Sequence, residues 1–205
     1  GEYQQFGDLE GIIDGILARR TSVATNVYNV VKAARYSGEQ KPVIFMGDRD
    51  DHYTTQSGDG YAAFIGGSTA QATHAMNEWW GKEGMGTMPH ALIQMFRGDL
   101  VAAAEAYHEM FPDDELAALV DYNNDVITDS LKVAKKFGSK LKSVRLDTSR
   151  TLVDKYFLRN HHLMGTFDPR GVNPELLFAL RKALNDEGFE HVKIMVTGGF
   201  TESRI

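Results

Sequence analysis

The chain has 205 residues, of which 42% are hydrophobic and 24% charged, a balance typical of a globular protein with enough apolar residues for a sizeable core. It contains no cysteine, which excludes a disulfide framework, thiolate zinc sites and cysteine nucleophiles. The formal net charge is -6 and no run of Lys or Arg stands out, so nucleic-acid binding is not expected.

The ends of the sequence carry no targeting segment. The chain begins at Gly1 rather than Met, and it has neither a signal peptide nor the run of about 20 apolar residues that a membrane helix needs. It stops shortly after the pair Gly198 and Gly199, without a terminal element. We therefore expect a cytoplasmic protein without membrane contact, and a fragment of a longer chain.

The first part of the chain is predicted to be mainly helical. Apolar residues recur at helical spacing from Leu9 to Val31 with no proline between them, which predicts one long helix with a break near Arg20. A short apolar run at residues 41–46 then predicts a buried strand. The polar, glycine-containing residues 47–60 predict a loop.

After residue 60, helices and strands are predicted to alternate. Periodic or Ala-rich segments indicate the helices, and short apolar runs indicate the strands. The helices are expected at residues 61–80, 99–110, 126–137 and 174–187, a loop opening onto a further helix at 84–90, and the strands at 116–122, 142–147 and 192–197. Such alternation predicts a parallel sheet, which places its chemistry at the carboxyl ends of its strands.

The residues at these predicted strand ends suit a phosphorylated sugar. A parallel sheet would bring cations, carboxylates and bare backbone to one rim. The set comprises Asp48, Arg49, Asp121, Tyr122, Arg145, Asp147, Thr197, Gly198 and Gly199. This mixture favours a ligand that carries phosphate, ribose hydroxyls and a carboxylate.

Two pairs in this set have a structural interpretation as well as a functional one. Gly198 and Gly199 could form only a tight turn, or they could let backbone N–H groups approach a phosphate. Arg145 and Asp147 lie two apart on a strand, so their side chains point to the same face. They could form a buried ion pair, or bind a carboxylate and ribose hydroxyls.

His90 is predicted in the first turn of a helix, directly after a glycine-containing loop. A histidine in this position is usually a capping or surface residue, and the local pattern alone does not favour a nucleophile. The other six histidines form no H-x-x-x-H or H-E-x-x-H pair, so no metal site built from histidine is expected.

Several segments together resemble the nicotinate phosphoribosyltransferases. Residues 86–92, Gly-Thr-Met-Pro-His-Ala-Leu, look like that family's Gly-Thr-x-x-His signature, and residues 144–148 are similar to its Arg-Leu-Asp-Ser strand. Residues 193–199 resemble its strand ending in a glycine-rich phosphate turn. Residues 17–25 are similar to the helix that joins its two domains, and the matches keep the family's order.

The resemblance implies an α/β fold: an irregular (β/α) barrel of the type II phosphoribosyltransferase kind, incomplete here and preceded by a linking helix from a smaller α/β domain. Residues 1–38 would be the end of that smaller domain with the linking helix. Residues 39–205 would be a partial barrel that forms the catalytic domain. The family comparison also implies a homodimer whose active site is usually completed across the dimer.

The resemblance further implies an activity in the salvage branch of NAD biosynthesis. The enzyme would form nicotinate mononucleotide and pyrophosphate from nicotinate and phosphoribosyl pyrophosphate, with Mg²⁺ on the latter and ATP as a co-substrate that is hydrolysed. Departure of pyrophosphate builds positive charge at the anomeric carbon, so carboxylates are expected around that carbon. Asp147 and Asp121 are the candidates for this role.

The family's functional residues match this sequence at defined positions. His90 matches the histidine that becomes phosphorylated by ATP, and Thr87 belongs to the same signature. Arg49 and Arg145 match contacts of the nicotinate ring or its carboxylate. The remaining matches are Asp147 as a ribose contact and Thr197, Gly198 and Gly199 as part of the 5′-phosphate turn.

Three alternatives stay open from the sequence. A quinolinate phosphoribosyltransferase shares the fold, but a dicarboxylate should require more cations than residues 47–51 supply. Nicotinamide is the second alternative substrate, although the neutral Thr69 and Ala70 favour the free acid. The third alternative is a non-catalytic barrel fragment that binds phosphate without turnover.

Overall fold

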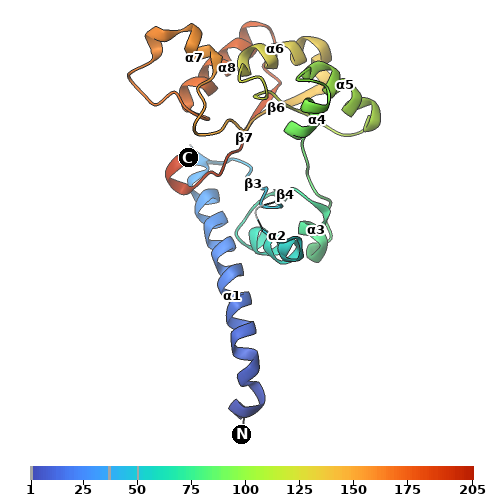
Figure 1. Ribbon diagram of the computed structural model, residues 1–205, viewed down its shortest axis with the longest axis vertical. Helices are drawn as coiled ribbons and strands as arrows, with labels where there is room; N and C mark the ends of the chain where they lie inside the picture. The colour runs from blue at the N-terminus through green and yellow to red at the C-terminus, as the bar shows by residue number, and fades with distance from the viewer. Residues whose placement is uncertain (1, 37, 50) are drawn as a thin grey trace. The chain divides into compact units, whose positions relative to one another are not determined.

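The computed structural model describes residues 2–36, 38–49 and 51–205, and the chain divides into two compact units. The first unit comprises Gly1–Gly86 with Phe200–Ile205, and the second comprises Thr87–Gly199. Figure 1 labels the helices and strands of both. The domain boundary expected after residue 38 does not coincide with this division, and the domain assignment stays a prediction.

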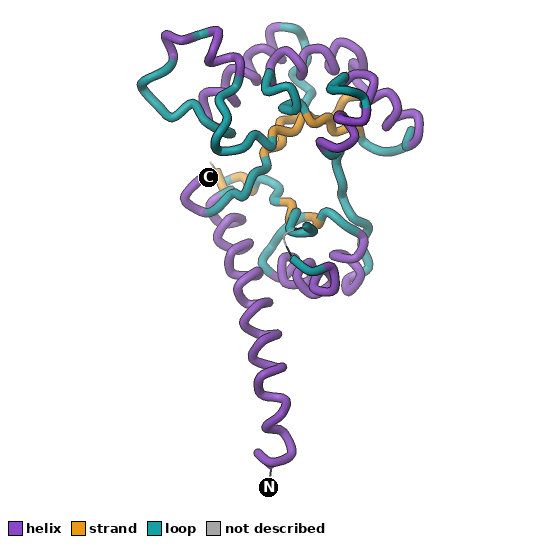
Figure 2. Tube along the Cα trace, in the orientation of Figure 1, coloured by secondary structure: helices purple, strands orange, loops and turns teal. Residues whose placement is uncertain are grey.

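The first unit is organised around one long helix. Helix α1 runs from Glu2 to Ala33 without the break predicted near Arg20, and Figure 2 shows it uninterrupted. It packs against α2 (Gln56–Ile65). The other elements are the antiparallel pair β1 (Arg35–Tyr36) and β2 (Glu39–Gln40), the parallel pair β3 (Ile44–Phe45) and β4 (Ala70–Gln71), the short helices η1 (Tyr53–Thr55), α3 (His74–Asn77) and η2 (Glu78–Trp80), and η5 (Glu202–Arg204).

Three sequence predictions for the first unit are wrong in part. Residues 47–60 are not all loop, because α2 already begins at Gln56. Residues 61–80 are not one helix, because α2 ends at Ile65 and strand β4 follows. The glycines misled the interpretation: Gly60 serves packing inside α2, since a Cβ there would lie 2.0 Å from the Met76 carbonyl oxygen. The strand predicted over residues 41–46 forms only at Ile44–Phe45.

The second unit is a three-stranded parallel sheet with helices on one side, as the alternating pattern predicted. The order is β5-β6-β7, and both pairings are parallel. Figure 1 shows α5, α6 and α8 together on one side of these strands. The bounds are α4 (His90–Met95), α5 (Leu100–Met110), β5 (Leu116–Leu119), α6 (Val126–Phe137), η3 (Gly138–Lys140), β6 (Leu141–Leu146), α7 (Lys155–Arg159), η4 (His161–Leu163), α8 (Pro174–Asp186) and β7 (Lys193–Val196). Closure of these strands into the expected barrel is not seen in the described residues.

The core of the second unit lies between the sheet and its helices. Val144 and Leu146 of β6 and Leu176, Leu180 and Leu184 of α8 are all fully buried. Each such side chain contributes about 1.5–3 kcal/mol through removal from water. Because side chains alternate along a strand, Arg145 and Asp147, two residues later, point away from these helices, toward the opposite face of the sheet.

Asp154 caps two helices of the second unit at once. Its carboxylate accepts the N–H of Val126 at 3.0 Å, where α6 begins, and the N–H of Tyr156 at 2.7 Å, where α7 begins. Asp125, the residue directly before α6, makes no such bond with its own side chain. Asp154 is fully buried, and burial raises the pKa of its carboxyl. The first turn of α6 is therefore satisfied by a residue that lies 28 positions later in the chain.

Candidate active site

The ends of the three strands in the second unit meet at one edge of the sheet. Asp121 follows β5, Asp147 follows β6 and Thr197 follows β7. One Asp121 carboxylate oxygen, Oδ2, accepts the backbone N–H of Asp147 at 3.0 Å. The N–H of Thr197 donates to the Leu146 carbonyl at 2.8 Å. The parallel register therefore gathers these three residues, as the sequence predicted.

Asp121 lies beside His90, the first residue of α4. Nε2 of His90 is 3.2 Å from Oδ1 of Asp121, whose side chain is 2% exposed, whereas that of His90 is 39% exposed. The contact has ion-pair distance but not the alignment of a hydrogen bond, so Oδ1 has no hydrogen-bond partner in the described part of the chain. Burial raises the pKa of the Asp121 carboxyl, while the neighbouring His90 and the Asp147 N–H oppose that rise. A buried carboxylate thus lies beside an imidazole that solvent can reach.

Arg145 and Asp147 share one face, as predicted, and they form an ion pair. Nη2 of Arg145 lies 3.4 Å from Oδ2 of Asp147. The Arg145 side chain is buried to about nine-tenths, with 9% of it exposed. The structural interpretation of the pair is confirmed, and a contact between Arg145 and a ligand stays a prediction.

The turn after β7 approaches Asp147. Gly198 and Gly199 have φ values of +119° and +64°, which favour glycine at both positions. A Cβ on Gly198 would lie 3.8 Å from Oδ1 of Asp147. An anion on this turn would therefore lie close to the strand ends that carry the carboxylates.

Arg150 is a member of this cluster that the sequence analysis missed. It belongs to the loop after β6, and its Nη2 donates to the carbonyl of Gly199 at 2.8 Å. Nothing in the local sequence distinguishes Arg150 from any exposed arginine. Arg150 lies near the turn because β6 pairs with β7. The one feature of the sequence that could have indicated a role for Arg150 is its position three residues after Asp147.

Two further predicted residues lie outside this set of contacts. Thr87 is half-buried in the segment that leads into His90. Arg49 is exposed in the first unit beyond β3, and the adjacent Asp50 lies outside the described residues. The predicted residues that meet in the second unit are His90, Asp121, Arg145, Asp147, Thr197, Gly198 and Gly199.

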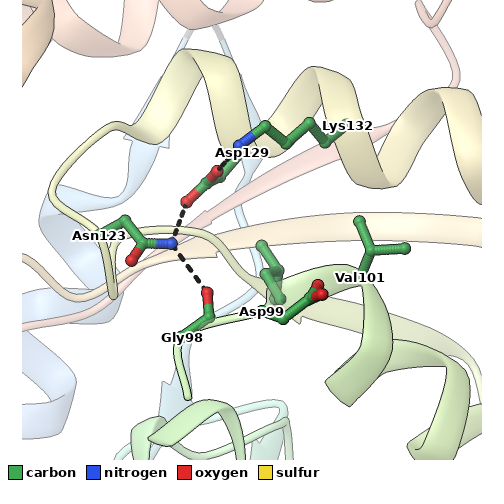
Figure 3. Close-up of a pocket in the computed structure, with 7 residues that line it drawn as sticks. Gly98, Asp99, Val101, Asn123, Asp129 and Lys132 are labelled. Atoms are coloured by element: carbon green, nitrogen blue, oxygen red, sulfur yellow. Dashed lines mark hydrogen bonds and ion pairs between the residues drawn. The ribbon is translucent and has the colours of Figure 1, made fainter. Parts of the chain in front are cut away.

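A separate pocket of about 230 Å³ lies near the start of α5 (Figure 3). It is lined by Gly98, Asp99, Leu100, Val101, Asn123, Asp129 and Lys132. The Asn123 amide donates to the Gly98 carbonyl at 3.0 Å and to Asp129 at 2.9 Å, and Lys132 donates to Asp129 at 3.0 Å. Because these polar groups bind one another, we assign no ligand to this pocket.

Searches for two other kinds of feature give negative results in the described residues. They contain no group of three or more His, Asp or Glu side chains that could hold a metal ion. Among the helices they form, none is long and apolar enough to cross a membrane.

No family model matches the chain, but it is similar to known proteins in sequence and in structure. The chain is 28% identical over 188 residues to a nicotinate phosphoribosyltransferase of Mycobacterium tuberculosis, found in two strains, and the match covers 89% of this chain and 34% of that protein. It is also similar to the crystal structure of a nicotinate-nucleotide pyrophosphorylase from Pyrococcus furiosus, with a TM-score of 0.72 and 31% identity, over 91% of this chain and 42% of that one. The chain thus spans about a third of the length of the curated relatives it matches.

These two likenesses support a phosphoribosyltransferase family for the chain. They also support a mixed α/β fold like that of the pyrophosphorylase, in agreement with the parallel sheet of the second unit. The identities of 28% and 31% do not distinguish one member of such a family from another.

Proposed function

We propose that the chain carries catalytic residues of a nicotinate phosphoribosyltransferase, which forms nicotinate mononucleotide and pyrophosphate in the salvage branch of NAD biosynthesis. The main support is the gathering of His90, Asp121, Asp147 and the Gly198–Gly199 turn at one edge of a parallel sheet. The likeness to the mycobacterial enzyme supports the same substrate. The homodimer and the cytoplasmic location stay predictions.

The carboxylates at the strand ends suit the chemistry at the anomeric carbon. As pyrophosphate leaves, positive charge builds on the ribose ring, and a fixed negative group near the ring stabilises that charge. Asp147 is held by Arg145 on one side and lies beside the glycine turn on the other. We therefore assign the 5′-phosphate to the turn and the ribose hydroxyls to Asp147.

Mg²⁺ would enter as part of the substrate, bound to phosphoribosyl pyrophosphate. Mg²⁺ prefers oxygen ligands, which the substrate and water supply. The carboxylates of Asp121 and Asp147 are oxygen ligands as well. When bound, the ion supplies positive charge to the leaving pyrophosphate. The part of this chain is to hold the phosphate and orient the ribose.

His90 is the proposed acceptor of a phosphoryl group from ATP. Its Nε2 lies beside the buried Asp121 carboxylate, so a proton is favoured on Nε2 and a lone pair on Nδ1. Attack by Nδ1 on the γ-phosphorus forms an N–P bond and breaks the P–O bond to ADP. Asp121 then offsets the positive charge that develops on the imidazole ring.

The name of the structural relative favours a second candidate. A nicotinate-nucleotide pyrophosphorylase could use the same ribose and phosphate contacts with a different pyridine carboxylate as its substrate. Quinolinate is the alternative substrate that the sequence left open. Such an enzyme would have no need of phosphorylated His90. ATP dependence therefore separates the two candidates.

The test is to incubate the chain with nicotinate, phosphoribosyl pyrophosphate and Mg²⁺, with and without ATP, and to measure nicotinate mononucleotide by chromatography. We expect ATP to stimulate product formation in the wild type, and His90→Ala to lower the stimulated rate about 100-fold or more. His161→Ala is the matched control, because His161 is an exposed histidine of the same unit.

Radioactive phosphate from ATP should label the wild type and His161→Ala but not His90→Ala. Product from quinolinate, formed without any effect of ATP, would favour the second candidate. Absence of both product and label in the wild type would reject the proposed function.

A further inference from the structure

We propose that Arg150 binds the 5′-phosphate of phosphoribosyl pyrophosphate together with the Gly198–Gly199 turn. This inference rests on the proposed function and adds a residue that the family resemblance did not supply. The Arg150 guanidinium donates through Nη2 to the Gly199 carbonyl at 2.8 Å. One of its five N–H groups is thereby used, and Nη2 lies 3.7 Å from the position of a Cβ on Gly199.

Arg150 differs from the neighbouring arginines in its partners. Arg145, Arg159 and Arg170 each form an ion pair with an aspartate. In the described part of the chain, Arg150 forms no ion pair with a carboxylate, and its hydrogen bond goes to a backbone carbonyl. Its positive charge is therefore not offset by a bound acid, and the planar guanidinium can hold a phosphate through two parallel hydrogen bonds.

The electrostatic surroundings of the turn require such a cation. The Asp147 carboxylate lies 3.8 Å from the position of a Cβ on Gly198, so a phosphate on the turn would meet a negative charge nearby. Arg145, the other cation of the cluster, is already paired with Asp147. Arg150 supplies positive charge at Gly199.

The loop that carries Arg150 is fixed by its own backbone bonds. The N–H of Leu152 donates to the Ser149 carbonyl at 3.0 Å, and the N–H of Gly171 donates to the Leu152 carbonyl at 2.8 Å. Gly171 has φ +67°, and a Cβ there would lie 3.2 Å from the Cα of Arg150. We infer that Gly171 is a positioning residue, because a larger residue there would press on the backbone of Arg150.

The inference is tested with ribose 5-phosphate, which carries the 5′-phosphate but no pyrophosphate. Calorimetry should show that the wild-type chain binds this probe and that Arg150→Ala binds it about 10- to 100-fold more weakly. Arg150→Lys should recover part of the affinity, since it keeps the charge and loses the planar fork. Arg170→Ala, which removes an exposed arginine of the same unit, should bind as the wild type does.

Kinetics give a second readout. Arg150→Ala should raise the KM for phosphoribosyl pyrophosphate about 10- to 100-fold and leave the KM for nicotinate unchanged. Gly171→Ala should raise the same KM, whereas Gly188→Ala should not. Gly188 is the matched control because it also has positive φ, at +80°, but no atom within 4 Å of an added Cβ.

The outcomes separate this inference from the proposed function. Product formation by the wild type, with unchanged ribose 5-phosphate affinity and unchanged KM in Arg150→Ala, would overturn the role of Arg150 and leave the transferase intact. Loss of ribose 5-phosphate binding in Arg150→Ala would support the phosphate site, even if the wild type formed no nicotinate mononucleotide. Weaker binding of inorganic pyrophosphate with unchanged binding of ribose 5-phosphate would overturn the assignment to the 5′-phosphate.

Discussion

The two units of the chain hold their helices in different ways. In the second unit, α8 and β6 bury six apolar side chains completely. In the first unit, α1 leaves Phe6, Ile12 and Leu17 more than half exposed. The sheet of the second unit therefore orients its site through a packed core, whereas contact between α1 and α2 depends more on polar groups.

An ionic cluster links α1 to α2. Arg19 donates to the buried Asp59 through Nε at 2.9 Å and through Nη2 at 2.6 Å. The guanidinium of Arg20 lies 5.0 Å from the ring centroid of Trp79 and occupies the space beside Gly58, where a Cβ would lie 1.7 Å from it. Gly58 is thus required for Arg20 to lie on α2.

The largest expected effect tests the difference in packing directly. Ile93→Ala removes a fully buried side chain of the second unit and should lower the free energy of unfolding by about 2–5 kcal/mol. Ile12→Ala, at a position of α1 that is 59% exposed, should change it by less than about 0.5 kcal/mol. Urea unfolding of the two variants would measure both, and equal losses would contradict the contrast between the units.

The next effect tests the ionic cluster of the first unit. Asp59→Ala leaves Arg19 without its buried partner and should cost about 1–3 kcal/mol of unfolding free energy. Asp51→Ala removes the exposed partner of the same arginine and should cost less than about 1 kcal/mol. High salt should weaken the Asp51 contact more than the Asp59 contact, because solvent screens the exposed pair. A larger loss for Asp51→Ala in thermal or urea unfolding would show that burial does not set the ranking.

The smallest effect concerns the pH dependence of stability at Asp121. Burial raises its folded-state pKa above the value of about 3.9 for an unfolded chain. Its stabilising contribution is therefore complete below the unfolded pKa and is lost as the pH rises through the folded pKa. Asp121→Asn keeps an acceptor for the Asp147 N–H but cannot ionise.

The measurement is urea unfolding of the wild type and of Asp121→Asn, at pH values from below the unfolded-state pKa of Asp121 to above its folded-state pKa. The free energy of unfolding of the wild type, minus that of Asp121→Asn, should decrease as the pH rises. The facing groups His90 and Asp147 are present in both proteins, so the ionisable carboxyl of Asp121 is the group that the substitution removes. A difference that grows with pH would mean that the neighbouring His90 outweighs burial.

Local sequence signals predicted the second unit well. The bounds of α6 were predicted as residues 126–137 and are confirmed, because Gly138 ends the helix with φ +53°. The strands β5, β6 and β7 were predicted from short apolar runs, and parallel pairing then brought Asp121 and Asp147 together. Here the apolar pattern of each strand and the end of α6 are specified by residues within or next to the element, whereas the first turn of α6 is capped by the distant Asp154.

The features that the sequence analysis missed depend on contacts between distant residues. Gly58 and Gly60 looked like loop residues, but they lie inside α2, where Arg20 and Met76 pack against them. Arg150 acquires its significance only from the turn at Gly199, which is 49 residues away in the chain. No local pattern of residue types carries such information.

The double cap made by Asp154 has a consequence for synthesis on the ribosome. Residues of α6 are synthesised before Asp154 exists, so the N–H of Val126 lacks this side-chain partner until 28 more residues have been added. At the usual rates of translation this interval lasts roughly one to six seconds. The start of α6 is therefore capped only after β6 has been made, because β6 precedes Asp154 in the chain.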